Sequence, residues 1–417
     1  MKSAHFSGTV PIAGRVRLVG ICALLGLAVA LASGCANSPA MAPTSALGLT
    51  PVSQERSFVD RLPPKDLDKR KLAQQPDSWF LARLDGPRIT IDNQTLDPKL
   101  QYEFQERTKQ RAASGRDYNA WLKKVWSTPD GRQKLRDAVD INWTTTAYDV
   151  GKVGFIQDLD IPGPGGALPS RIYRPQGKGT KPALVYFHGG GFLMASYKAV
   201  QPQAKILTRE GGIVVISVNY RLAPEHKFPA AQHDAIAAYR WVVAHADALG
   251  IDPDRVGVGG DSAGGNLAAV VAQQQIEDGQ AVPKALLFYY PFIDVDFARY
   301  PSYDVFGDGF GLDKQFIKNA TEQLFAKPSD KDNRWLHLAD SLSFSNFPPS
   351  IVAYAGFDPL RDQGRTLAAR LREGGVAVIE HEYPSLNHGF LELSGAIEAA
   401  HEACFTTARE IGKLLRQ

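Results

Sequence analysis

Continuous apolar runs that alternate with helical patterns constrain the fold of this chain more than any other feature of its sequence. ALVYF at 183–187 and IVVISV at 213–218 have the uninterrupted apolar character of strands that are buried on both faces. Helical patterns separate such runs, for example in the segments that begin at Ala230 and Ser262. Strands that alternate with helices form mostly parallel sheets with helices on both faces. The sequence therefore predicts an α/β fold over residues 151–417.

The residues before this α/β region predict a helical layer. Helical spacing runs from Leu96 through LDPKLQYEFQERTKQRAA, and again through YNAWLKKVWSTPDGRQKLRDAV, with a break at Pro129 and Gly131. We interpret residues 96–150 as an N-terminal helical cap. The stretch from about 294 to 347 is rich in aromatic residues and turns, and we expect it to pack over the carboxyl edge of the sheet.

The first 34 residues have the pattern of a signal peptide. Basic residues precede the apolar run LVGICALLGLAVALAS at 18–33, and the segment contains no acidic residue. A charged start followed by an apolar run is typical of secretory signals. Residues 35–95 come next, and their Pro, Ser, Ala and Thr content up to about Pro64 predicts a tether or extension that is partly disordered.

Cys35 is the candidate lipidation site. It follows Ala32, Ser33 and Gly34, and small residues directly before a cysteine resemble the lipobox of bacterial lipoproteins, although Ala32 stands where leucine is commonest. An uncleaved membrane anchor and an ordinary secretory signal cut nearby stay open as alternatives. The lipoprotein hypothesis predicts export to the cell envelope, with a membrane anchor at Cys35 on the periplasmic side or the outer surface. Cys404 would then have no partner for an internal disulfide.

GDSAG, from Gly260 to Gly264, predicts a catalytic nucleophile. It lies between the strand-like RVGVG and a helical pattern, which is the strand–turn–helix context that G-x-S-x-G requires. The glycines permit a sharp turn that lifts Ser262 to the edge of the sheet at a helix N-terminus. We interpret Asp261 as fixing the shape of this turn.

Two later residues complete a predicted triad in the order acid, then histidine. Asp358 directly follows the strand-like SIVAYAG, and His388 lies in NHGF just after the last strand-like run. Both are expected at carboxyl ends of strands, where open α/β sheets collect their functional groups. Asp294 and Asp362 lie at similar places, but Asp294 follows a different strand. Asp362 begins a helix, where a carboxylate is explained by the helix dipole.

Three consecutive glycines predict an oxyanion hole. The run ALVYF ends at His188 and continues into Gly189, Gly190 and Gly191. Glycine lets the backbone turn its amides toward a ligand, and a serine that attacks a carbonyl needs such donors already in place. We predict Gly190 and Gly191 as donors together with the amide of Ala263, the residue after the nucleophile.

Charge and residue spacing argue against several other classes of function. Outside the first 34 residues the chain has 44 basic and 44 acidic residues, which gives no basic footprint for nucleic acid. We find no cluster of Cys and His with the spacing of a zinc site, and the triple glycine lacks the G-K-[ST] ending of a phosphate-binding loop. Glu225 and His226 lie in a Pro-flanked loop, which we expect them to brace.

These motifs together resemble the hormone-sensitive-lipase-like family of α/β-hydrolases, and its bacterial esterases are the closest pattern. The resemblance covers about Leu96 to the C-terminus and rests on five segments: HGGGF at 188–192, YRLAPEHKFPAA at 220–231, GDSAGGNLA at 260–268, DPLRD at 358–362 and NHGF at 387–390. It implies an α/β-hydrolase fold with an N-terminal helical cap, no cofactor and short-acyl ester substrates. It also implies that Ser262 is the nucleophile, Asp358 the acid and His388 the base.

Two other classes of function remain open at this point. Plant gibberellin receptors share the family's fold but lack the catalytic histidine, so the presence of His388 favours an enzyme over a non-catalytic binder. A true lipase or an amidase could use the same triad. The sequence leaves acyl length, the alcohol and the oligomeric state undetermined.

Overall fold

A computed structural model of the protein describes residues 47–52, 58–341 and 344–417. The predicted signal of residues 1–34 and Cys35 lie outside the described residues. The described residues belong to one compact unit. Within them, no helix is long and apolar enough to cross a membrane.

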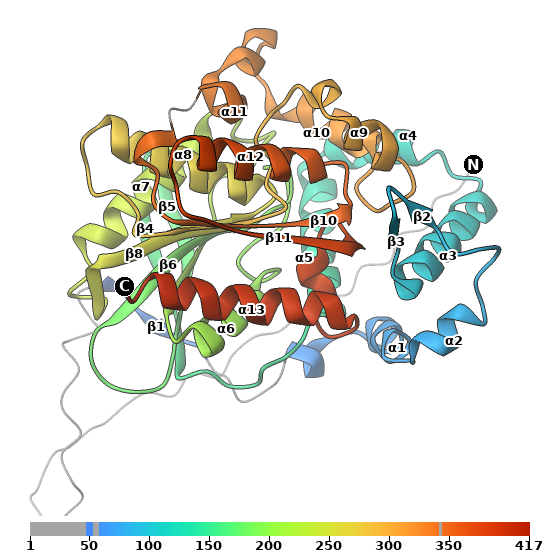
Figure 1. The fold of residues 1–417 in the computed structure, drawn as a ribbon, viewed down its shortest axis with the longest axis horizontal. Coiled ribbons are helices and arrows are strands. Elements are labelled where there is room, and N and C mark those ends of the chain that lie inside the picture. Colours follow the sequence, from blue (N-terminus) through green and yellow to red (C-terminus); the bar gives the residue numbers. More distant parts are fainter. Residues whose placement is uncertain (1–46, 53–57, 342–343) are drawn as a thin grey trace, which may run out of the picture. The chain divides into compact units, whose positions relative to one another are not determined.

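The centre of the fold is a nine-stranded sheet with the strand order β1-β4-β5-β7-β6-β8-β9-β10-β11 (Figure 1). Strands β7, β6, β8, β9, β10 and β11 are parallel, whereas β1, β4 and β5 join one end of the sheet in antiparallel register. This is the mostly parallel sheet that the sequence predicted. The bounds of its strands are Thr50–Pro51 (β1), Phe155–Gly163 (β4), Gly166–Arg174 (β5), Lys181–Phe187 (β6), Val214–Val218 (β7), Ile251–Asp261 (β8), Leu286–Tyr289 (β9), Ser350–Phe357 (β10) and Val378–Asn387 (β11).

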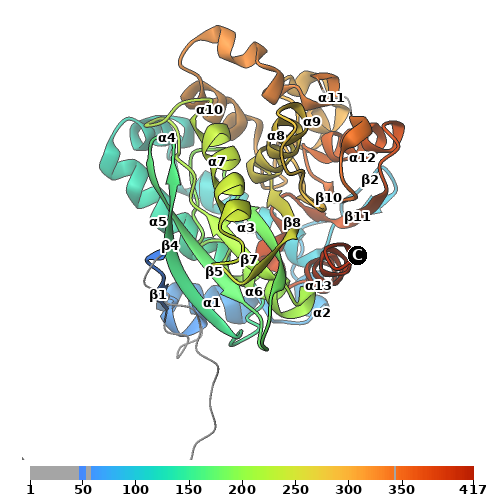
Figure 2. The same ribbon diagram turned by 90° about the vertical axis from the view of Figure 1, so that its left-hand side faces the viewer.

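The central strands are buried because helices cover both faces of the sheet. Every residue of β7, β9 and β10 is buried, which explains why these strands read as continuous apolar runs. One face is covered by α7 (Ala230–Ala244), α8 (Ala263–Glu277) and α12 (Arg361–Glu373). The other face is covered by α6 (Gln201–Gly211) and α13 (Glu398–Leu414) (Figure 1). The long antiparallel pair β4–β5 runs beside α7 at one side of the sheet (Figure 2).

The predicted N-terminal helical layer consists of three helices. These are α3 (Pro98–Ser114), α4 (Tyr118–Trp126) and α5 (Pro129–Thr145). The side chain of Thr128 caps α5 by accepting a hydrogen bond from the Gly131 amide, and Pro129 opens the helix. The break predicted at Pro129 is therefore the start of a new helix, because proline is well suited to the first helical position.

The described residues of the segment predicted as an extension, 47–52 and 58–95, include regular elements. It contributes the edge strand β1, a 3₁₀ turn (Phe58–Arg61), helices α1 (Pro64–Ala73) and α2 (Asp77–Leu81), and a two-stranded hairpin of β2 (Thr90–Ile91) and β3 (Gln94–Thr95). Arg70 of α1 donates hydrogen bonds to the carbonyls of Thr145 and Ala147. On the hairpin, Gln94 donates to Glu382 of β11. Contacts with distant parts of the chain hold this segment in place.

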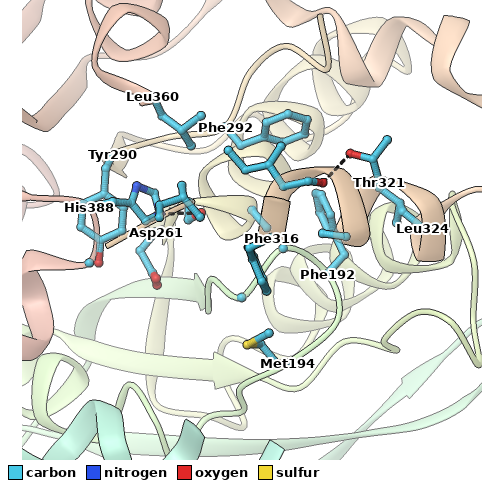
Figure 3. Close-up of a pocket in the computed structure, with 18 of the residues that line it drawn as sticks. Phe192, Met194, Asp261, Tyr290, Phe292, Phe316, Thr321, Leu324, Leu360 and His388 are labelled. Atoms are coloured by element: carbon cyan, nitrogen blue, oxygen red, sulfur yellow. Dashed lines mark hydrogen bonds between the residues drawn. The ribbon is translucent and has the colours of Figure 1, made fainter. Parts of the chain in front are cut away.

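The stretch between β9 and β10 packs near the carboxyl ends of the strands, as its aromatic content predicted. It contains α9 (Pro301–Phe306), α10 (Lys314–Leu324), α11 (Leu338–Ser341) and four short 3₁₀ turns at Phe297–Arg299, Pro328–Asp332, Arg334–Leu336 and Phe344–Asn346. The Phe228 amide donates to the carbonyl of Leu324, which ties the end of α10 to the loop after β7. Helix α10 thereby forms one wall of the cavity described below (Figure 3).

Candidate active site

Ser262 lies on a strained turn between β8 and α8. Its φ and ψ angles are 52° and −116°, a conformation that residues with a side chain rarely adopt. The turn is possible because its neighbours are glycines. A β-carbon on Gly260 would collide with the backbone of Gly264, and one on Gly264 would collide with the carbonyl of Phe187. The predicted strand–turn–helix geometry therefore presents the Ser262 hydroxyl at the end of a buried strand.

The three side chains predicted as a triad lie in hydrogen-bonding order. His388 Nε2 is 3.1 Å from Ser262 Oγ, and His388 Nδ1 is 2.8 Å from Asp358 Oδ2. Asp358 is fully buried, and its other oxygen accepts a hydrogen bond of 2.7 Å from the Leu360 amide. The ring of Tyr290 packs against His388 with 4.6 Å between centroids (Figure 3). This arrangement can move a proton from the serine to the imidazole while the carboxylate holds the ring.

The two other aspartates considered from the sequence are engaged elsewhere. Asp294 accepts hydrogen bonds from His337 Nδ1 at 2.9 Å and from Arg299 at 2.8 Å. Asp362 accepts from the Ser302 amide at 2.8 Å and from Arg361 at 3.0 Å. Each carboxylate therefore stabilises a local structure away from His388.

The backbone after β6 bends sharply at Gly190 and Gly191, which line the same cavity as Ser262. Gly190 and Gly191 have φ angles of 104° and 62°, which glycine adopts without strain. The carbonyl of Gly190 accepts hydrogen bonds from the amides of Leu193 and Met194, which fixes the bend. Within the described residues, the amides of Gly190, Gly191 and Ala263 have no hydrogen-bond partner, and all three residues line the same cavity as Ser262. This arrangement leaves three donors available to an oxyanion.

Comparison with known proteins agrees with this geometry. Residues 184–392 match the model of the α/β-hydrolase fold family. The chain is an α/β-hydrolase. Over 245 residues it is 44% identical to the carboxylic ester hydrolase LipN of Mycobacterium tuberculosis, covering 57% of this chain and 65% of that protein. Over 243 residues it is 38% identical to an ethyl acetate hydrolase of Pseudomonas putida, covering 57% of this chain and 76% of that protein.

Solved structures show that the likeness extends beyond the matched motifs. An esterase of Pyrobaculum calidifontis is 34% identical, with a TM-score of 0.65 over 68% of this α/β-hydrolase and 93% of the esterase. An ester hydrolase from the Lake Arreo metagenome is 30% identical, with a TM-score of 0.70 over 79% and 100% of the two chains. The family indicated by the sequence motifs is therefore confirmed at the level of fold.

Two further residues of the hydrolase motifs join the glycine loop to the nucleophile turn. His188 is buried and stacks on Tyr220 at 4.4 Å, and burial lowers its pKa to about 4, so the ring is neutral. Asp261 is buried and accepts a hydrogen bond of 2.9 Å from Tyr186. A β-carbon on Gly189 would collide with the Asp261 carboxylate. Gly189 therefore lets the loop pass close to the turn that carries Ser262.

Burial raises the pKa of Asp261 to about 6. Hydrogen bonds from Tyr186 and from the Gly189 amide act in the opposite direction but do not cancel the effect of burial. The sequence suggested only that Asp261 fixes the shape of the turn. In the structure Asp261 also contacts strand β6, because it accepts the hydrogen bond from Tyr186.

A cavity of about 130 Å³ opens in front of Ser262 and His388 (Figure 3). One part of it is apolar and is lined by Phe192, Met194, Phe292, Phe297, Phe316, Ile317 and Leu324. The part beside His388 also has polar groups, those of Tyr290, Asp261 and Glu392, together with Trp143 from α5. The cap helix α5 and helix α10 therefore both contribute to the wall of the site.

Sequence reasoning did not identify Trp143, Tyr290 or Glu392 as site residues. Trp143 lies in an ordinary helical pattern, and Tyr290 reads as the end of a buried strand. Glu392 carried one usable signal, since NHGFLEL places a charged residue four positions after the predicted catalytic histidine, within an otherwise apolar segment.

Proposed function

We propose that this α/β-hydrolase is a serine carboxylesterase that hydrolyses short- to medium-chain acyl esters through an acyl-enzyme intermediate. The observation that carries the proposal is the hydrogen-bonded series from Ser262 through His388 to Asp358, at a cavity faced by free backbone amides. The names of the relatives support ester hydrolysis, because they include a carboxylic ester hydrolase, an ethyl acetate hydrolase and esterases. No step of this chemistry requires a cofactor.

Acylation uses the three side chains in sequence. His388 Nε2 takes the proton of Ser262 Oγ, and the oxygen attacks the ester carbonyl. The carbonyl oxygen becomes an oxyanion, which the amides of Gly190, Gly191 and Ala263 stabilise. The intermediate collapses when the bond to the alcohol oxygen breaks, and His388 gives its proton to that oxygen. Asp358 keeps the imidazole in the tautomer that this transfer needs.

Deacylation repeats the same steps with water. His388 removes a proton from a water molecule, which attacks the acyl carbon of the acyl-enzyme. The second oxyanion occupies the same place, and its collapse breaks the bond to Ser262 Oγ. His388 returns the proton to the serine, so the free carboxylic acid leaves and the enzyme is regenerated.

The size of the cavity supports a short acyl chain. Its volume of about 130 Å³ is close to that of an apolar protein cavity that holds one benzene molecule. We therefore expect activity to peak at or below about eight acyl carbons. Hydrolysis of p-nitrophenyl esters from acetate to palmitate tests this, with Ser262→Ala as the inactive control. The highest turnover on palmitate would favour a true lipase, and equal rates in Ser262→Ala would reject the nucleophile.

We also propose that the protein is exported to the cell envelope as a lipoprotein anchored through Cys35. The proposal is supported by the sequence alone, from the basic start, the apolar run at 18–33 and the small residues before Cys35. An exported esterase would meet its ester substrates outside the cytoplasm.

A further inference from the structure

Glu392 places an unpartnered carboxyl group at the catalytic cavity. It belongs to the 3₁₀ turn Phe390–Leu393, and it lines the cavity together with Ser262 and His388. Its backbone is fixed at both ends, because its amide donates to the carbonyl of Gly389 and its carbonyl accepts from Thr146 Oγ1 at 2.8 Å. Within the described residues, its carboxylate has no hydrogen-bond partner. The side chain is thus held in position by its backbone, with its oxygens left unpaired.

An unpaired carboxyl group at this depth is unfavourable for stability. Glu392 is partly buried, and it lines the wall of the cavity. Burial raises the pKa of Glu392 well above its usual value, Asp261 and Glu103 raise it further, and Lys69 and Arg107 act in the opposite direction. Burying a polar group without a partner costs free energy. A ligand that pairs with this group would remove that cost.

The cavity has two sides that differ in chemistry. His388 must protonate the departing alcohol oxygen, so the alcohol part of the ester lies on the His388 side. Glu392, only four residues after His388, lies on this side with Trp143 and Tyr290. The side toward α10 is apolar and can hold the acyl chain. The polar groups are therefore concentrated where the alcohol would be bound.

A small adjoining cavity extends this polar side. It has a volume of about 20 Å³ and shares Trp143, Asp261, Tyr290 and Glu392 with the catalytic cavity. It also contacts Gln203, whose buried side-chain oxygen has no partner within the described residues. A space of this size suits a single water molecule or hydroxyl group. Both observations point to a hydrogen-bonding group on the bound ligand.

We propose that Glu392 determines specificity by hydrogen-bonding a hydroxyl group on the alcohol part of the ester. The preferred substrate class is then an ester of a diol or polyol rather than of a simple alkanol. This inference rests on the proposed esterase function, whose mechanism it leaves unchanged. Glu392 binds the leaving alcohol, while the proton transfers stay with His388.

Matched pairs of acetate esters test the proposal. Propyl acetate and 2-hydroxyethyl acetate differ only in a terminal methyl against a hydroxyl, and butyl acetate with 3-hydroxypropyl acetate forms a longer pair. Values of kcat/KM are divided by the rate of hydroxide-catalysed hydrolysis of each ester, to remove differences in leaving-group reactivity. We expect the wild-type enzyme to prefer the hydroxylated member of at least one pair by about tenfold or more.

Three variants separate recognition from structure. Glu392→Met removes the hydrogen bond at similar size and should abolish the preference, because kcat/KM falls far more for the hydroxylated ester than for its alkyl partner. Glu392→Gln can still donate and accept, and it should retain most of the preference. Glu103→Gln, the control, removes a nearby carboxylate on α3 that does not line the cavity and should leave the preference unchanged.

Several results would overturn the proposal. Equal corrected rates within both pairs for the wild-type enzyme would reject it without any variant. An equal loss on alkyl and hydroxylated esters in Glu392→Met would show a structural role only. A preference for a cationic ester such as acetylcholine over both pairs would show that the carboxylate selects charge instead. If no alkyl ester is hydrolysed at all, the proposed function fails first, so the two failures are distinguishable.

Discussion

At the scale of single residues, Asp358 is distinguished from its neighbours by what it binds. It is fully buried and bonds to His388, whereas Asp362 bonds to the Ser302 amide and to Arg361. Asp358→Asn should lower turnover by about 10⁴-fold, because an amide favours the wrong tautomer of the histidine, as in serine proteases. Steady-state hydrolysis of a p-nitrophenyl ester measures this.

Asp362→Asn is the matched control for that experiment. It changes an aspartate four residues later, in the first turn of α12, and should lower the free energy of unfolding by about 1 kcal/mol through weaker helix-terminus and hydrogen-bond interactions. Turnover should stay close to that of the wild-type enzyme. If both variants fold and Asp362→Asn is the inactive one, the assignment of the acid is wrong.

Asp261 predicts a dependence of stability on pH. Because burial raises its pKa to about 6 in the folded state from an ordinary value near 3.8, the folded protein binds more protons than the unfolded chain between these values. Its contribution to stability therefore falls as pH rises from about 4 to about 6 and then levels off. A shift of this size corresponds to about 3 kcal/mol.

Asp261→Asn removes this titration and provides the measurement. The free energy of unfolding is measured by denaturant unfolding for both proteins at pH 4 and at pH 8. From pH 4 to pH 8, the stability of the variant relative to the wild-type protein should increase by about 2–3 kcal/mol. A difference between the two proteins that does not depend on pH would show that Asp261 has an ordinary pKa.

At the scale of structural elements, Glu225 connects the cap helix α5 to the loop before α7. It accepts hydrogen bonds from Arg132 at 2.7 Å and from Arg136 at 2.8 Å. Burial alone would raise the pKa of Glu225, but the hydrogen bonds from Arg136 and Arg132 lower it to about 2. The expectation that Glu225 braces its loop was therefore incomplete, because its partners lie on α5, which also carries Trp143 into the site.

Glu225→Gln should weaken this connection at neutral pH. Because the pKa of Glu225 is lowered by folding, its ionised carboxylate stabilises the folded state above about pH 4.5. This stabilisation is lost as the pH falls from there toward 2. We expect a loss of about 1–2 kcal/mol at pH 7 and a smaller loss at pH 3, measured by denaturant unfolding. Glu103→Gln, which weakens a partly exposed i,i+4 pair with Arg107, should cost at most about 0.5 kcal/mol. Equal effects of the two substitutions would contradict the bridging role of Glu225.

Helices and strands with a clear apolar or helical periodicity within their own segment could be predicted from the sequence. Elements that form only through contacts with distant parts of the chain could not. The strands β6 and β7 and the helix α8 carry continuous apolar or helical spacing, so their places were evident. The two-residue strands β1, β2 and β3 are too short to show any periodicity. The same division holds in the site. Ser262, Asp358 and His388 have motifs, whereas Glu392 matters only because the fold brings its side chain to the cavity.

At the scale of the whole molecule, the proposed location in the cell envelope rests on Cys35, which lies outside the described residues. If it is lipidated, Cys35→Ser should release the enzyme from the membrane fraction or block its processing, since each buried methylene of an acyl chain contributes about 0.8 kcal/mol. Cys22→Ser, within the predicted signal but outside the lipobox, should leave the distribution unchanged. Fractionation followed by an esterase assay measures both. Membrane retention of Cys35→Ser with an uncleaved N-terminus would favour the anchor alternative.

The N-terminal segment touches both edges of the central sheet, and this has a consequence for the order in which the chain folds. Strand β1 pairs with β4 at one edge, while the hairpin β2–β3 and the Asp97 amide bond to β11 near the other. The hairpin β2–β3 and Asp97, which are synthesised early, can therefore form these contacts only after β11, near the C-terminus, has been synthesised. Such long-range closure makes folding slow. Until β11 arrives, the growing sheet has an open edge, the kind of surface on which incomplete chains associate. We therefore expect chains that end before β11 to associate more readily than the full-length chain.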